Sequence, residues 1–130
     1  MLTRRPATAA LVGWTFLVWT TRIRNIWTDD ALTTGEQWGR TALAGSFTLL
    51  AVVVLAGRWQ RATWPAPAVQ ALAAWTTVVW IVRAVGIATA DHDAGFVAVH
   101  LVLAVVSIAL SALAVREGRR RPAPLEPAQA

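Results

Sequence analysis

The segment WTFLVWTTR at residues 14–22 is followed 61 residues later by WTTVVWIVR at residues 75–83. Both copies read W-T-x-x-V-W-x-x-R. Self-similarity at a fixed spacing is typical of a repeat architecture. The sequence therefore predicts two tandem repeats within 130 residues. At the same offset, without gaps, the flanking identities pair Pro6, Ala7, Ala10, Leu11, Ile26, Thr28 and Asp30 with Pro67, Ala68, Ala71, Leu72, Ile87, Thr89 and Asp91.

The composition indicates a membrane protein. Hydrophobic residues make up 56% of the chain and charged residues only 15%, which is too apolar for an ordinary soluble domain. The net charge of +5 belongs to arginines that flank apolar runs and form no basic face with interleaved aromatics, so we expect no nucleic-acid partner. The chain has no cysteine, which excludes disulfides, thiolate metal sites and cysteine nucleophiles.

Four apolar runs predict four transmembrane helices, since about 20 residues cross the hydrocarbon core. The predicted spans are residues 7–27, 41–57, 67–90 and 96–115. No small-residue cleavage site follows the first run, so we expect a retained helix and not a signal peptide. In the second span, Ala42, Gly45 and Ser46 are predicted to allow another helix to approach closely.

Polar segments separate the predicted spans. Residues 28–40 are polar, contain two glycines and predict a loop. Residues 58–66 end in a proline-containing turn, with Pro65 inside the segment and Pro67 just after it, and are interpreted as a linker between the repeats. Residues 116–130 predict a basic, disordered tail, because they offer too little hydrophobic bulk to fold.

The arginines predict the orientation through the positive-inside rule. We expect residues 1–6, the linker and the tail in the cytoplasm, and both intervening loops outside, in the plasma membrane of a bacterium. On the outer side lie Arg22, Arg24, Arg40 and Arg83. On the cytoplasmic side lie Arg4, Arg5, Arg58, Arg61, Arg116, Arg119, Arg120 and Arg121.

Each half contains two spans, so both halves enter the membrane from the same side. The repeats, residues 7–57 and 67–115, are therefore expected to be parallel and related by an axis along the membrane normal. The predicted fold is an all-α membrane protein in which two tandem helical hairpins form an up-down-up-down bundle of four transmembrane helices.

The residues shared by the two repeats lie on one helix face. At 100° per residue, the matched positions of the first span occupy one arc and the unmatched positions almost all occupy the opposite arc. A lipid-facing surface tolerates any apolar residue, so we expect the matched face to point into the bundle or into a cavity. Its polar and aromatic members are Trp14, Thr15, Trp19, Arg22, Trp75, Thr76, Trp80 and Arg83.

Arg22 and Arg83 are candidate functional residues. Placing an arginine at the membrane centre costs at least about 2.5–3.5 kcal/mol, so an arginine within a span suggests a functional site. Near the interface that cost is smaller, so we favour a snorkelling anchor or a structural ion pair over a functional site. Under the expected symmetry, Arg22 is able to meet Asp91 while Arg83 meets Asp30. Alternatively, carbonyl groups and lipid phosphates neutralise the two arginines.

Trp14 and Trp75 lie in the middle of their spans. They are interpreted as packing residues or as walls of an apolar pocket. A buried indole N–H needs a hydrogen-bond acceptor. The candidate acceptors are Thr15, Thr76, Ser107 and Ser111.

Asp91, His92, Asp93 and His100 form the only cluster of metal-ligand residue types. The first repeat has alanine and glycine where the second has His92 and His100, so the cluster is not repeated. We therefore favour an aspartate at the start of a helix and a buried, hydrogen-bonded His100, with no metal and no cofactor. No catalytic motif appears, so the sequence does not predict an enzyme.

Two functional hypotheses follow. The first is a structural protein or accessory subunit of a larger membrane complex, with a membrane-protein partner or a second copy of the chain. The alternative is a small oligomeric transporter or channel for an anion or a lipid-like solute, in which Arg22 and Arg83 act at the outer face. Both imply contact with the lipid bilayer and with anionic lipid at residues 116–121.

Overall fold

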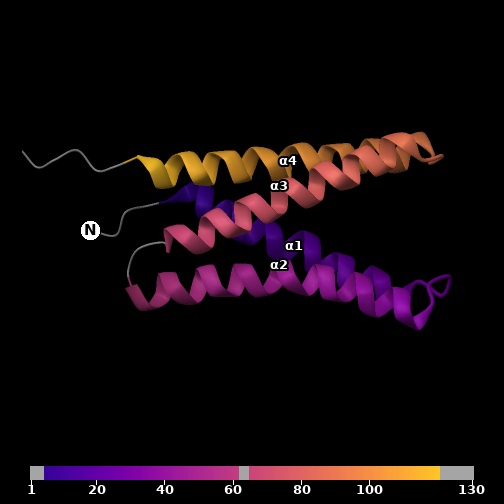
Figure 1. The fold of residues 1–130 in the computed structure, drawn as a ribbon, viewed down its shortest axis with the longest axis horizontal. Coiled ribbons are helices and arrows are strands. Elements are labelled where there is room, and N and C mark those ends of the chain that lie inside the picture. Colours follow the sequence, from indigo (N-terminus) through magenta and orange to yellow (C-terminus); the bar gives the residue numbers. More distant parts are fainter. Residues whose placement is uncertain (1–4, 62–64, 121–130) are drawn as a thin grey trace, which may run out of the picture.

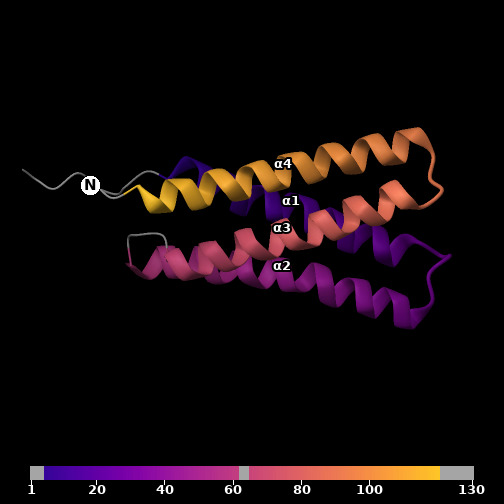
Figure 2. The same ribbon diagram turned by 45° about the horizontal axis from the view of Figure 1, so that its top comes forward.

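The computed structural model describes residues 5–61 and 65–120, in which the chain forms four α-helices and no strand. Neighbouring helices run in opposite directions (Figures 1 and 2). The loops 29–33 and 90–93 lie at one end of the bundle, called the loop end here. The opposite, terminal end holds the start of the first helix and the end of the last. The predicted all-α, up-down-up-down bundle is confirmed. The helices are α1 (Pro6–Thr28), α2 (Thr34–Arg61), α3 (Ala66–Thr89) and α4 (Ala94–Arg119).

Three of these helices are long and apolar enough to cross a membrane, over Thr34–Gln60, Ala66–Thr89 and Ala94–Arg119. They indicate a membrane protein. With 23 residues, α1 is about 35 Å long, but threonines, tryptophans and two arginines dilute its apolar run. Thr8, Thr15 and Trp19 are at most 3% exposed, so the bundle covers part of that polar surface. That α1 also crosses the membrane stays a prediction.

Capping residues fix where α2 begins. Thr33 N donates to Glu36 Oε2 at 2.9 Å, and Glu36 N donates back to Thr33 Oγ1 at 3.3 Å. This reciprocal pair is a capping box, which satisfies two amides of the first turn. The helix therefore starts at Thr34, and the prediction of a loop through residue 40 is wrong.

The other helix ends also differ in part from the prediction. Asp93 accepts from Phe96 N at 2.9 Å and starts α4, as expected of a helix-start aspartate. That helix continues to Arg119, so the prediction of disorder is wrong for residues 116–119. The predicted linker is helical through Arg61. Residues 1–4, 62–64 and 121–130, which include Arg4, Arg121 and most of the predicted tail, lie outside the described residues.

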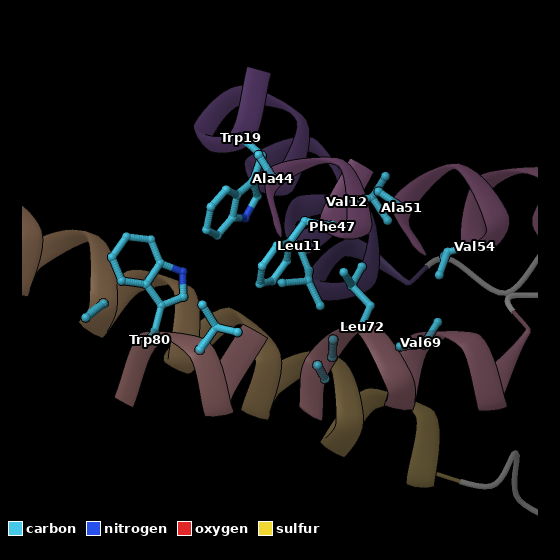
Figure 3. Packing of buried hydrophobic residues seen from close by; sticks show 14 residues of the cluster. Leu11, Val12, Trp19, Ala44, Phe47, Ala51, Val54, Val69, Leu72 and Trp80 are labelled. Atoms are coloured by element: carbon cyan, nitrogen blue, oxygen red, sulfur yellow. The ribbon is translucent and has the colours of Figure 1, made fainter. Parts of the chain in front are cut away.

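A cluster of buried side chains from all four helices forms the core (Figure 3). Trp19 of α1 stacks on Phe47 of α2, with ring centroids 4.1 Å apart and planes inclined by 9°. Trp80 of α3 lies across the bundle, with its ring centroid 6.2 Å from that of Trp19. Aromatic pairs of this kind contribute roughly 0.5–1.5 kcal/mol beyond their buried area. The aromatic contacts thus join both hairpins.

Small residues on α2 permit close packing, but not where the sequence suggested. Ala44 and Ala51 are fully buried. In contrast, Ala42 is exposed, and a Cβ added at Gly45 would meet no atom within 4 Å. The prediction for Ala42 and Gly45 is wrong, because the buried stripe of α2 runs through positions 44, 47, 51 and 54 at helical spacing. Of the three predicted positions, Ser46 accepts a hydrogen bond from Trp75 of α3.

Most of the residues that the two repeated segments share lie toward the interior of the bundle. In α1 the matched residues from Leu11 to Ile26 are buried or half-buried, while the unmatched Gly13, Leu17 and Thr20 are exposed. In α3, Leu72, Thr76, Val79, Trp80 and Ile87 are buried and Arg83 is half-buried. The repeated residues are therefore mostly interior, whereas the matched Trp75 is 37% exposed and the unmatched Val12 is only 5% exposed.

Candidate functional site

A cavity of about 320 Å³ lies between α1, α3 and α4 and is called the tryptophan cavity here. Near the loop end its wall is polar and includes two guanidinium groups; farther along α1 the wall is mostly apolar. Six residues singled out from the sequence line it: Trp14, Trp19, Arg22, Trp80, Arg83 and His100.

A second cavity, of about 270 Å³, lies between α1, α2 and α3 and is called the arginine cavity. It shares Trp19, Arg22 and Arg83 with the tryptophan cavity and adds Arg40 of α2. Among the described residues that line it there is no carboxylate. Three like charges near one another repel, and the repulsion is stronger away from bulk water, so an anion between them is favoured.

The arginines lie where the two hairpins separate. Figures 1 and 2 show the α1–α2 and α3–α4 hairpins apart at the loop end. Arg22 and Arg83 are half-buried near that end, while Arg40 is exposed on the neighbouring helix. The side chains thus combine partial burial with access from the loop end.

The crossed ion pairs are not formed. Asp30 and Asp91 lie exposed in the two loops, just beyond the ends of α1 and α3. Within the part of the chain that the structure describes, neither carboxylate makes an ion pair with Arg22 or Arg83. Each arginine precedes the aspartate of its own repeat by eight residues, or about 12 Å along a helix. The carboxylates therefore leave the two guanidinium groups uncompensated.

Two tryptophan–serine hydrogen bonds link the hairpins. Trp14 Nε1 donates to Ser107 Oγ at 2.9 Å, and Trp75 Nε1 donates to Ser46 Oγ at 2.9 Å. The two tryptophans are 61 residues apart, and so are the two serines. Each hairpin thus supplies the donor of one bond and the acceptor of the other. Ser107 was predicted as an acceptor; Ser46 was missed, although the repeat spacing from Ser107 points to it.

The threonines proposed as acceptors have other surroundings. Thr15 Oγ1 donates to the carbonyl of Leu11 at 2.7 Å. Thr76 Oγ1 is buried and has no hydrogen-bond partner. Ser111 Oγ donates to the carbonyl of Ser107 at 2.8 Å. Of the four predicted acceptors, Ser107 alone therefore holds a tryptophan.

His100 lies on the wall of the tryptophan cavity, half-buried and hydrogen-bonded. Its Nδ1 donates to the carbonyl of Phe96 at 2.8 Å, which leaves Nε2 as the acceptor of the neutral ring. Phe96 stacks against both imidazoles, with ring centroids 4.5 Å from His92 and 4.0 Å from His100. Phe96 thus lies against both histidines, and residues 5–61 and 65–120 hold no group of three or more potential metal ligands.

The terminal end of the bundle is joined by Glu117, near the end of α4. Its carboxylate accepts from Ala7 N at 3.1 Å, Thr8 N at 2.9 Å and Thr8 Oγ1 at 2.8 Å. Helix α1 has no side-chain cap of its own at Arg5. Glu117 therefore caps α1 from across the bundle, where a negative charge is favourable. The sequence assigned Glu117 to the tail and gave no sign of this contact.

The structure brings six of the nine candidate residues to one cavity and leaves Asp30, Asp91 and Trp75 outside it. Trp75 instead lies near Phe47, with ring centroids 5.9 Å apart. Arg40 was counted in the sequence only for its charge, although its place directly before an apolar run was a usable signal. The chain matches no protein-family model, no curated protein and no solved structure.

Proposed function

We propose that this protein is a multi-pass membrane protein that binds an anionic group between Arg22, Arg40 and Arg83. One observation carries the proposal: guanidinium groups from three helices line one cavity, and no carboxylate does so among the described lining residues. Guanidinium groups bind phosphate and carboxylate through paired, charge-assisted hydrogen bonds. Partial burial strengthens the attraction to an anion relative to bulk water.

Under the predicted orientation, the arginine cavity faces the outside of the cell. An anion bound there is either transported or held as a recognition element. The two cavities that share Arg22 and Arg83 and the Glu117 contact at the terminal end support a transporter that opens outward in this conformation. In that case the chain acts as a small transporter, with two or more copies in the membrane.

The accessory-subunit function remains the second proposal, and we retain the plasma membrane as the location. Purification in mild detergent separates the two functions, because an accessory subunit co-purifies with a partner of different sequence. We also retain anionic lipid as a partner at the terminal end, where Arg116, Arg119 and Arg120 are exposed. This proposal does not involve the arginine cavity.

We further infer that the two halves arose by duplication. The reciprocal bonds of Trp14 and Trp75 support this, because donors and acceptors both keep the 61-residue spacing. The duplication explains why the site contains two equivalent arginines, Arg22 and Arg83. Arg40 has no arginine at the corresponding place in the second half, where Leu101 stands. The proposed site thus consists of two repeated arginines and of Arg40, which has no counterpart in the second half.

The test is calorimetric titration of the protein in nanodiscs of zwitterionic lipid with inorganic phosphate. We expect saturable binding that Arg22→Gln and Arg83→Gln each weaken about tenfold or more, since a hydrogen bond to a charged group contributes roughly 1.5–3 kcal/mol. Arg24→Gln is the matched control: Arg24 is exposed on the same helix and lines neither cavity. It should leave the affinity unchanged.

Arg40→Gln is a third variant, and we expect it to fold because Arg40 is exposed and its neutralisation leaves the interior unchanged. Thermal unfolding and elution volume check that every variant is folded. The proposal is overturned if phosphate shows no saturable binding, or if Arg24→Gln weakens binding as much as Arg22→Gln does.

A further inference from the structure

We infer that the bound anion is the headgroup of a single-chain amphiphile, whose apolar chain lies in the tryptophan cavity. This inference rests on the proposed anion site and specifies its ligand. The two cavities meet at Arg22 and Arg83, which line both of them. A headgroup held by this pair therefore has an apolar space directly beside it.

The walls of the tryptophan cavity are polar at one end and apolar at the other. Near Arg22 the wall includes the Asn25 amide and His100. Toward the middle of the membrane it is formed by Trp14, Leu17 and Leu103. Trp14 and Arg22 are eight residues apart, or about 12 Å along α1. The wall therefore matches a molecule with a charged head and an extended apolar chain.

Trp14 presents an apolar surface to this cavity despite its indole N–H. Ser107 Oγ already accepts that N–H at 2.9 Å. The ring therefore needs no polar partner from a ligand. An alkyl chain against it leaves no buried donor unpaired.

The charge of the residues that line the two cavities, and the volume of the tryptophan cavity, restrict which ligands fit. No carboxylate lines either cavity among the described residues, so a cationic headgroup finds no partner there. At about 320 Å³, the tryptophan cavity is at the lower end of the roughly 300–1,000 Å³ of ligand pockets. It therefore fits one chain and not the two of a typical bilayer phospholipid.

The ligand enters from the lipid phase. Leu17 and Val99 line the tryptophan cavity and are 62% and 58% exposed. On helices that cross a membrane, exposed apolar side chains face lipid. A chain already dissolved in the bilayer thus reaches the cavity laterally, between α1 and α4, while its head stays at the level of the arginines.

The experiment uses quenching of tryptophan fluorescence by dodecyl phosphate that carries bromine on its terminal carbon. The protein is held in nanodiscs of zwitterionic lipid. We expect saturable quenching that inorganic phosphate competes away. Leu17→Phe/Val99→Phe, which narrows the cavity without touching its charges, should weaken the apparent affinity about tenfold. The matched control is Leu49→Phe/Val102→Phe, at positions that are 63% and 61% exposed and line neither cavity.

The possible outcomes test the amphiphile ligand separately from the binding of an anion. The inference fails if quenching only rises linearly, as for a probe dissolved in the bilayer, or if both double variants behave alike. The anion site stands in that case, provided that inorganic phosphate still binds and Arg22→Gln weakens its binding. In wild-type protein, ethyl phosphate should bind no better than inorganic phosphate, because its chain is too short to fill the cavity. If ethyl phosphate binds as tightly as dodecyl phosphate does, the inference is also overturned.

Discussion

At the scale of single residues, the bundle places few polar groups in its interior and gives most of them a partner. Trp14 and Trp75 donate to serines of the opposite hairpin, which orients both rings. Ser107 is only 1% exposed, so the loss of either partner leaves a buried polar group. These bonds therefore stabilise the contact between the hairpins.

We expect equal coupling in the two tryptophan–serine bonds. Double-mutant cycles with Trp14→Phe and Ser107→Ala, and with Trp75→Phe and Ser46→Ala, should each give about 0.6 kcal/mol, typical of hydrogen bonds between membrane helices. The measurement is the free energy of unfolding in detergent micelles. A coupling near zero in either cycle contradicts the reciprocal arrangement.

Most of the site residues that the sequence predicted come from the repeat, whereas His100 is not repeated and was singled out by its residue type. Arg22, Arg83 and the tryptophans were found because both copies keep them on one helix face. Arg40 and Glu117 are not repeated, and their neighbours come from distant helices, so no local pattern revealed their roles. The pairing of Arg22 with Asp91, one of the two arrangements that the sequence allowed, is not formed, since helix periodicity fixes a face but not how far a loop extends past the helix end.

At the scale of helices, two different devices fix the starts of α1 and α2. The start of α2 is capped locally by Thr33 and Glu36. Their T-x-x-E pattern is present in the sequence, but the two neighbouring glycines favoured a loop. The start of α1 is capped by Glu117, from 109 residues away in sequence. The first device follows from the sequence, whereas the second requires the assembled bundle.

Glu117→Gln should loosen the first turn of α1. Replacing the carboxylate by an amide removes a charge-assisted contact, worth roughly 1.5–3 kcal/mol, with Ala7 and Thr8. We therefore expect hydrogen exchange at these two amides to accelerate about tenfold or more. Glu36→Gln is the control, because it affects only the start of α2. Unchanged exchange at Ala7 and Thr8 in Glu117→Gln would show that the contact is not formed in the membrane.

At the scale of the whole molecule, the fold was predictable because apolar runs and polar loops alternate clearly. Four helices and their alternating directions follow from that pattern. The close approach of Gly57, in α2, to Pro65, just before α3, does not: a Cβ added at Gly57 would lie 2.7 Å from Pro65 Cγ. The cavities also could not be predicted, because their walls combine three helices whose relative tilt no single segment determines.

Labelling of single cysteines tests whether α1 crosses the membrane. The chain has no cysteine, so single cysteines at Arg5 and Gly118 can be labelled with a membrane-impermeant maleimide. If all four helices cross, both positions are labelled only from the cytoplasmic side. If α2, α3 and α4 alone cross, Arg5→Cys is labelled from outside while Gly118→Cys is not. His92→Cys is the control for the outer side.

The most direct test of the anion site is to locate an anion in it. The protein is crystallised with sodium selenate, and the selenium positions are determined by anomalous diffraction. We predict a selenium peak between Arg22, Arg40 and Arg83, with selenate oxygens about 2.7–2.9 Å from their guanidinium nitrogens. Selenium peaks confined to exposed arginines such as Arg24 or Arg116, with none in the arginine cavity, would contradict the account.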